Sequence, residues 1–331
     1  MTTTAHLPDT EPPAPVRRRR RGDTERGVSR VFRWVSTGSA VLLLAVLAAV
    51  AIFLVQRGLP ALTAPAERMR AEGGLPQGVD TFAQYIGPLV FGTLLAAAMA
   101  LALATPVAVG IALFISHYAP RRLAAGIGYV VDLLAAIPSV VFGLWGGSTL
   151  APVISTLWVW LAGVLDALPF LEVQATRTGR SLATAAVVLA VMVLPIITAV
   201  AREVFLQTPR LHEEAALALG ATRWEVIKTA VLPFGRSGVI SAAMLGLGRA
   251  LGETMAVLMI LSPGLLYSFQ IFDAGQQQTI AANIASKFPE ASGLAVNTLI
   301  ATGLALFVIT MAVNMLARWI VARRKDFSGA N

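Results

Sequence analysis

Residues 213–233 read EEAALALGATRWEVIKTAVLP and lie between two long apolar segments. Pro209 suits the first turn of a helix, and Glu213 and Glu214 follow early enough to stabilise the helix dipole. The apolar residues of this helix recur at i, i+4, i+7 and i+8, which places them on one face: Leu211, Ala215, Ala218 and Leu219. We therefore predict a short amphipathic helix at the start of a polar insert.

A second helix is expected after a turn. Gly220 is a natural helix stop, and the segment from Thr222 to Glu225 matches a capping box, which starts a new helix. We predict that this second helix ends before Pro233. An amphipathic hairpin of this kind fits either the groove of a partner protein or the lipid surface, and amphipathicity alone leaves both open.

The composition indicates a protein that lives in a bilayer. Of the 331 residues, 56% are hydrophobic and only 13% are charged, and the mean hydropathy is +0.72. So little charge cannot shield that apolar content from water. The chain has no cysteine, and its histidines are scattered at positions 6, 117 and 212, so we expect no disulfide, no thiol nucleophile and no metal site. We predict no catalytic residue in this chain. A Walker lysine motif is absent from the sequence, and ATP hydrolysis by this chain is therefore not expected.

We predict an all-helical membrane protein with six spans. The first span contains the apolar run from Val35 to Val55. A basic N-terminus followed by an apolar stretch could also be a signal peptide, but this run is longer than the apolar core of a signal peptide. Five more spans are expected at 84–116, 128–159, 182–205, 237–262 and 293–320, each above the ~20 residues that cross a bilayer. Pro106 lies inside the second span. Pro138, with glycines at 143, 146 and 147, interrupts the third.

The distribution of basic residues sets the orientation. With the N-terminus inside, the cytoplasmic segments hold 19 Lys and Arg and the outer segments hold six, which places both termini and the insert at 206–236 in the cytoplasm. Residues 1–33, basic and without an apolar face, are predicted to be a disordered cytoplasmic tail, and residues 323–331 to be a second tail. The net charge of +8 is thus a topology signal, and no nucleic-acid partner is expected.

A charged pair is expected inside the fifth span. Arg249 lies about twelve residues into it, roughly 18 Å deep, where an arginine costs on the order of 3 kcal/mol. Glu253 follows at i+4, where a salt bridge can offset part of that cost. Gly248 and Gly252 permit close approach of another helix. The pair either locks helices together or lines a translocation path, where a guanidinium suits an oxyanion.

The insert resembles the EAA loop of the permeases of ABC importers. The matching residues are Glu214, Ala215, Ala216, Gly220, Leu232 and Pro233, while Ala230 stands where isoleucine is usual. The resemblance implies that this hairpin, with Glu213 beside the motif, is the coupling helix that docks in a cleft of a cytoplasmic ATPase. It also favours a protein partner over the lipid surface.

A second resemblance concerns the fifth and third spans. Residues 246–255 (GLGRALGETM) and 136–143 (AIPSVVFG) resemble the PstC family of permease subunits of phosphate ABC importers, and the likeness extends over about residues 80–322. Residues 34–79, which are predicted to form the first span and an outside loop, contribute little to this resemblance. The resemblance implies a type I ABC-importer permease fold in the inner membrane, with Arg249 and Glu253 along the translocation path.

The partners follow from the same resemblance. It implies a PstA-like second permease, a PstB-like cytoplasmic ATPase dimer that uses ATP, and a PstS-like extracytoplasmic phosphate-binding protein. The chain itself, surrounded by membrane lipid, is expected to bind no cofactor. The alternatives are a permease for another oxyanion (phosphonate, sulfate or molybdate), a membrane scaffold or sensor that recruits a cytoplasmic partner, and a secondary transporter. The absence of an evident internal repeat gives the last no support.

Overall fold

The structure is a computed structural model. It describes the backbone of residues 22–166 and 173–325, and the side chains of residues 31–166 and 173–319. The expected tails therefore lie partly outside the described residues, at 1–21 and 326–331. All regular structure in the described part of the chain is helical. The contacts divide the chain into two units, residues 1–53 and residues 54–331.

The first unit contains most of helix α1 (Gly22–Thr63). The segment from Val31 to Thr63 is apolar and long enough to cross a membrane, which confirms the first predicted span. Every described side chain from Val31 to Val50 is exposed, as is expected of a helix that faces lipid. Helix α1 begins at Gly22, so the backbone of residues 22–33, which belong to the predicted tail, continues the helix of the first span.

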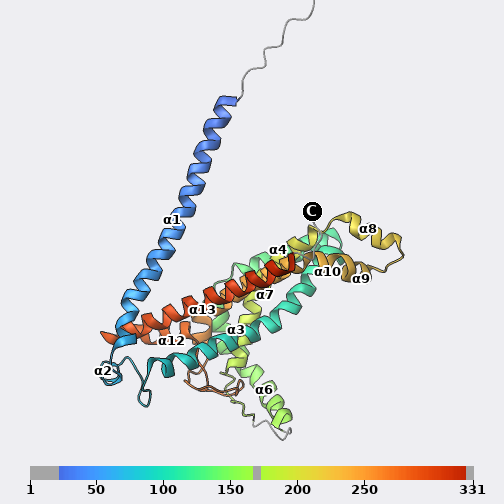
Figure 1. The fold of residues 1–331 in the computed structure, drawn as a ribbon. Coiled ribbons are helices and arrows are strands. Elements are labelled where there is room, and N and C mark those ends of the chain that lie inside the picture. The colour runs from blue at the N-terminus through green and yellow to red at the C-terminus, as the bar shows by residue number, and fades with distance from the viewer. Residues whose placement is uncertain (1–21, 167–172, 326–331) are drawn as a thin grey trace, which may run out of the picture. The chain divides into compact units, whose positions relative to one another are not determined.

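The second unit contains the remaining helices (Figure 1). Those long and apolar enough to span a membrane lie at Phe82–Tyr118, Ser139–Asp166, Leu182–Leu206, Arg223–Leu251 and Leu294–Trp319. The elements along them are α3 (Phe82–Leu113), η1 (Phe114–Tyr118), α5 (Ser139–Trp145), η2 (Gly146–Leu150), α6 (Ala151–Asp166), α7 (Leu182–Leu206), α9 (Arg223–Val226), η3 (Ile227–Val231), α10 (Leu232–Leu251) and α13 (Leu294–Lys325). Shorter elements connect them: α2 (Ala66–Ala71), α4 (Arg121–Ala135), α8 (Arg210–Ala218), α11 (Met255–Ile260), α12 (Ile280–Lys287) and η4 (Phe288–Glu290).

The third span begins later than predicted. The predicted bounds are 128–159, but residues up to Ala135 belong to the separate helix α4, and the membrane-length helix runs from Ser139 to Asp166. Pro138 separates the two, because it has no N–H to donate and it disfavours the helical conformation of Ile137.

The fifth span was also predicted with the wrong bounds. The second helix of the polar insert does not end before Pro233 but continues through η3 and α10 to Leu251. The turn before the proline is a π turn in which the Leu232 N–H donates to the Ile227 carbonyl. This wider turn accommodates the ring of Pro233, which cannot donate a hydrogen bond and crowds the preceding turn.

The core is built on α7, against which α3 and α10 pack. One face of α3 presents alanine at every fourth position, and each of these residues is at most 1% exposed: Ala96, Ala100, Ala104, Ala108 and Ala112. Small side chains let two backbones approach closely, which is how helices associate without a hydrophobic driving force in lipid. This packing fixes the ends of α3, α7 and α10, where the polar insert is attached.

Candidate functional site

The polar insert forms the predicted hairpin of two helices, α8 and α9. The Schellman motif that ends α8 comprises hydrogen bonds from the Ala221 N–H to the Ala216 carbonyl (3.1 Å) and from the Gly220 N–H to the Leu217 carbonyl (2.9 Å). Gly220 has a φ of +85°, a left-handed conformation that favours glycine. The predicted helix stop at Gly220 is therefore confirmed.

The predicted capping box at the start of α9 is also confirmed. The Thr222 N–H donates to the Glu225 carboxylate (2.7 Å), and the Glu225 N–H donates to the Thr222 hydroxyl (3.4 Å). These reciprocal bonds satisfy backbone donors that a helix N-terminus leaves free. The two helices are thus fixed relative to each other by local interactions.

The outer surface of the hairpin is apolar and uncovered. No residue of α8 is buried, and Figure 1 shows α8 and α9 at one end of the second unit, away from α12. The large exposed side chains are Leu211, Leu217, Leu219 and Trp224, of which Leu219 is 90% exposed. Ala215 and Gly220 are exposed beside them, and Ala216 is half-buried. The predicted stripe of Leu211, Ala215, Ala218 and Leu219 is confirmed as a surface that nothing in the described chain covers.

The two glutamates of the motif face different surroundings. Glu214 is exposed, and it makes no ion pair within the described residues. Glu213 is half-buried, and its Oε1 lies 3.6 Å from Nε2 of His117, which belongs to η1 at the end of α3. The predicted ATPase contacts therefore separate into an outward group around Glu214 and an inward residue, Glu213.

The expected ion pair between Arg249 and Glu253 does not form. Helix α10 ends at Leu251, so the i+4 relation on one helix face is lost before it reaches Glu253. Glu253 is only 8% exposed, and its Oε1 accepts a hydrogen bond from the Ala256 N–H (3.1 Å) in the first turn of α11. The carboxylate thus stabilises the start of another helix. Among the described residues, the buried Nε of Arg249 has no hydrogen-bond partner.

The glycines beside Arg249 do not pack against another helix of this chain. A Cβ at Gly248 would meet no atom within 4 Å, and one at Gly252 would meet only the carbonyl of Gly248, at 3.7 Å. The close helix packing expected at this pair is therefore not made by the described chain. The face that carries Gly248, next to Arg249, is open to another subunit or to a solute.

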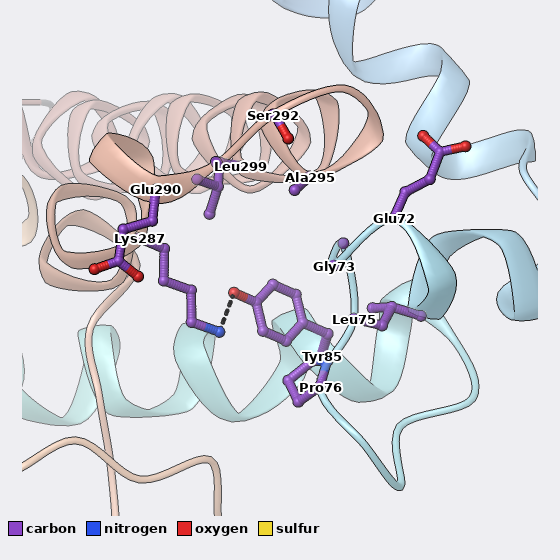
Figure 2. Close-up of a pocket in the computed structure, with 12 residues that line it drawn as sticks. Glu72, Gly73, Leu75, Pro76, Tyr85, Lys287, Glu290, Ser292, Ala295 and Leu299 are labelled. Atoms are coloured by element: carbon purple, nitrogen blue, oxygen red, sulfur yellow. Dashed lines mark hydrogen bonds between the residues drawn. The ribbon is translucent and has the colours of Figure 1, made fainter.

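A polar site that the sequence analysis missed lies between α3, α12 and the start of α13. Figure 2 shows Lys287 directed at the Tyr85 hydroxyl, beside a cavity of about 320 Å³. Lys287 Nζ donates to the Tyr85 hydroxyl (3.2 Å), which donates to Asn283 Oδ1 (2.7 Å), and Asn283 Nδ2 donates to Gln278 Oε1 (2.9 Å). Burial lowers the pKa of the Lys287 ammonium. No local pattern could have predicted this network, because Tyr85 and Asn283 are 198 residues apart.

Tyr85→Phe is expected to lower the free energy of unfolding by about 1–3 kcal/mol. The substitution leaves Oδ1 of Asn283, a fully buried residue, without its donor. The measurement is thermal or denaturant unfolding of the purified chain in detergent. Tyr129→Phe is the control, because it removes the same hydroxyl from a ring that is 67% exposed. Equal stability changes in the two variants would contradict the structural role of the network.

Comparison with known proteins decides the family. Residues 104–326 match the family model described as "Binding-protein-dependent transport system inner membrane component". The chain belongs to this family. The matched segment includes the α8–α9 hairpin, Arg249 and Glu253. Together with six membrane-length helices among the described residues, the match identifies a multi-pass membrane protein.

Several curated proteins are similar to the chain over most of its length. "Phosphate transport system permease protein PstC 2" of Mycobacterium tuberculosis (strain ATCC 25618 / H37Rv) is 45% identical over 300 residues, which cover 88% of this chain and 91% of that protein. "Phosphate transport system permease protein PstC" of Mycobacterium leprae (strain TN) is 48% identical over 280 residues, covering 83% of this chain and 87% of that protein.

A solved structure confirms the predicted fold class. A chain in the crystal structure of a bacterial ABC transporter involved in the import of the acidic polysaccharide alginate superposes with a TM-score of 0.51 at 17% identity. The superposition covers 88% of this chain and 98% of that one. The all-helical fold is therefore that of an ABC-importer permease.

Proposed function

We propose that the chain is a permease subunit of an ATP-driven importer, which translocates inorganic phosphate into the cytoplasm by alternating access. The observation that carries the proposal is the identity of 45–48% to proteins named as phosphate transport system permeases, over more than four fifths of the chain. Because these alignments cover 83–88% of the chain, the similarity includes the membrane spans as well as the hairpin.

The proposed orientation has both termini and the hairpin in the cytoplasm. It is supported by the 19 Lys and Arg on that side against six on the other. In this orientation α2, α12 and the cavity beside Lys287 face outward, where an extracytoplasmic binding protein delivers the substrate. The description of the family as binding-protein-dependent supports that partner.

The hairpin is the proposed contact with a separate ATPase dimer. Its large exposed apolar side chains, among them Leu219 at 90% exposure, form a surface that a partner protein would cover. Glu214, Ala215, Ala216 and Gly220 lie on or beside this surface and complete the contact. Because the sequence has no Walker lysine motif, the ATP is bound and hydrolysed by the partner. A second, PstA-like permease completes the path.

Arg249 is the proposed phosphate contact within the path. A guanidinium binds tetrahedral oxyanions through a planar fork of donors, and its buried Nε is not used by the described chain. A Cβ at the neighbouring Gly248 would meet no atom within 4 Å, which leaves space beside Arg249 that an anion could occupy. Glu253 is proposed to shape the same part of the path by holding the start of α11 in place.

Uptake of radiolabelled phosphate tests the proposed function. Cells that lack this gene are compared with the same cells complemented with it, at limiting phosphate, with sulfate and molybdate as competitors. Restored uptake that only unlabelled phosphate suppresses is the expected result. Suppression by sulfate or molybdate would instead assign another oxyanion. Unchanged uptake, with the protein present in the membrane, would remove phosphate as the substrate.

A further inference from the structure

Glu213 and Glu214 are consecutive residues of α8, yet they occupy different environments. Successive side chains on a helix point about 100° apart, so the two carboxylates cannot share one contact. The Glu213 side chain is 28% exposed and lies against His117, whose side chain is only 14% exposed. Glu214 faces outward on the surface that carries Leu211 and Leu217. The geometry thus turns Glu213 toward the membrane spans.

Nε2 of the His117 ring faces the Glu213 carboxylate. The other ring nitrogen, Nδ1, lies 2.7 Å from the hydroxyl of Ser116. If Ser116 donates to Nδ1, the neutral ring carries its proton on Nε2. If the Ser116 hydroxyl instead donates to the Leu113 carbonyl (3.3 Å), Nδ1 donates to Ser116, and Nε2 then carries a proton only in the doubly protonated ring. The arrangement in which Ser116 donates to Nδ1 is the one that presents Nε2–H of a neutral ring to Glu213.

This contact joins α8 to the packed end of α3. Just before His117, the side chains of Ala112 and Leu113 form a core with the end of α7 and with η3: Ala201, Phe205, Ile227 and Val231. Helix α8 buries no residue of its own, and its main packing contacts are with α9 and η3. Within the described residues, Glu213–His117 is the one side-chain hydrogen bond or ion pair that connects α8 to a membrane-spanning helix.

Two of the places where the hairpin meets the membrane spans are π turns. His117 is in η1, where the Ala119 N–H donates to the Phe114 carbonyl, and the hairpin enters α10 through η3. A π turn is an irregular, deformable step in a helix and is frequent at functional sites. Besides its short chain connection to α7, the hairpin therefore meets the spans at two places where a span can change its winding.

From this geometry we propose that Glu213 is a positioning residue that transmits the movement of α8 to α3 through His117, and is not a contact with the ATPase. The inference rests on the proposed function and assigns Glu213 a role different from that of Glu214. Movement of the hairpin by the ATPase then reaches two spans by separate routes. It reaches α10 through the continuous helix from Arg223 and α3 through the Glu213–His117 contact.

A double-mutant cycle in the complete importer tests the proposal. The complex is purified with its native partners and reconstituted in vesicles, and phosphate transported per ATP hydrolysed is measured together with retention of the ATPase. Glu213→Gln and His117→Asn are each expected to lower that ratio roughly tenfold, as for a typical coupling between two sites, while the ATPase still co-purifies. The double variant is expected to be no worse than either single one. Glu203→Gln, an exposed carboxylate near the end of α7, is the control and should leave the ratio unchanged.

The exchange variant, His117→Glu with Glu213→His, adds a readout that loss of folding cannot imitate. It restores a donor–acceptor pair in reverse and is expected to recover most of the coupling. Failure of Glu213→Gln to retain the ATPase would overturn the proposal, because it would make Glu213 a direct contact. An unchanged ratio in Glu213→Gln, or fully additive losses without rescue, would overturn it as well. A wild-type complex that transports no phosphate would contradict the proposed function itself. The variants are therefore compared with wild-type vesicles that transport phosphate, so that failure of the Glu213 proposal can be told apart from failure of the proposed function.

Discussion

Arg249→Met is expected to reduce phosphate uptake by about two orders of magnitude while the importer still assembles. Charge-assisted hydrogen bonds from a guanidinium to an oxyanion are each worth about 1.5–3 kcal/mol, and a loss of about 2.7 kcal/mol corresponds to roughly 100-fold. Methionine fills a similar volume without a charge. Because no described residue pairs with the buried Nε, the substitution leaves no partner unsatisfied in this chain.

The measurement is initial-rate uptake in cells, together with co-purification of the partner subunits. Arg236→Met is the matched control, because it removes the same group from an exposed position on the same helix. Arg249→Lys keeps the charge but loses the planar fork and is expected to retain an intermediate rate. A complex that no longer assembles after Arg249→Met would make the arginine an architectural residue and would contradict its role in the path.

The features that follow from neighbouring residues could be predicted from the sequence. The capping box at Thr222, the left-handed stop at Gly220 and the break at Pro138 each depend on two to four consecutive residues, and all three are present. Membrane spans are similarly local, because length and hydropathy decide them. Their bounds were wrong where an adjoining helix is polar or amphipathic, as in α4 and α9, since the helix then extends beyond its apolar part or begins after it.

The end of α10 at Leu251 could not be predicted, because packing between distant segments determines it. Helix α11 lies against α5, where a Cβ at Gly143 would be 2.8 Å from Cα of Ala256 and one at Gly147 would be 2.9 Å from the Met259 carbonyl. The glycines that were interpreted only as an interruption of the third span therefore form the surface that receives α11. Reaching that surface requires α10 to end before Glu253, which removes the expected ion pair with Arg249.

The inward contact of Glu213 was missed for a related reason. The sequence shows two adjacent glutamates at the start of a helix, and the dipole argument treats them alike. Their difference depends on where the end of α3 lies, 96 residues earlier in the chain, and on which nitrogen of His117 Ser116 engages. Local patterns thus identified the hairpin, and only its surroundings distinguish the outward residues from the inward one.

Gly220→Val is expected to lower uptake by roughly 5–30-fold without affecting insertion of the chain into the membrane. Gly220 has a φ of +85°, and an L-residue in this left-handed region costs about 1–2 kcal/mol, with a β-branched side chain at the upper end. That cost opposes the Schellman motif, so the hairpin adopts its docking geometry in a smaller fraction of molecules, by about tenfold for each 1.4 kcal/mol. Insertion is unaffected because α8 buries nothing.

Gly126→Val provides the control for this last variant. A Cβ at Gly126 also meets no atom within 4 Å, but its φ lies outside the left-handed region and its place inside α4 tolerates a side chain. Uptake and ATPase retention are measured for both variants at equal amounts of membrane protein. Because both glycines stand in open space, steric collision cannot explain a difference between them, and the backbone conformation of the hairpin remains as the cause. Equal uptake in the two variants would mean that coupling does not depend on the left-handed turn at Gly220.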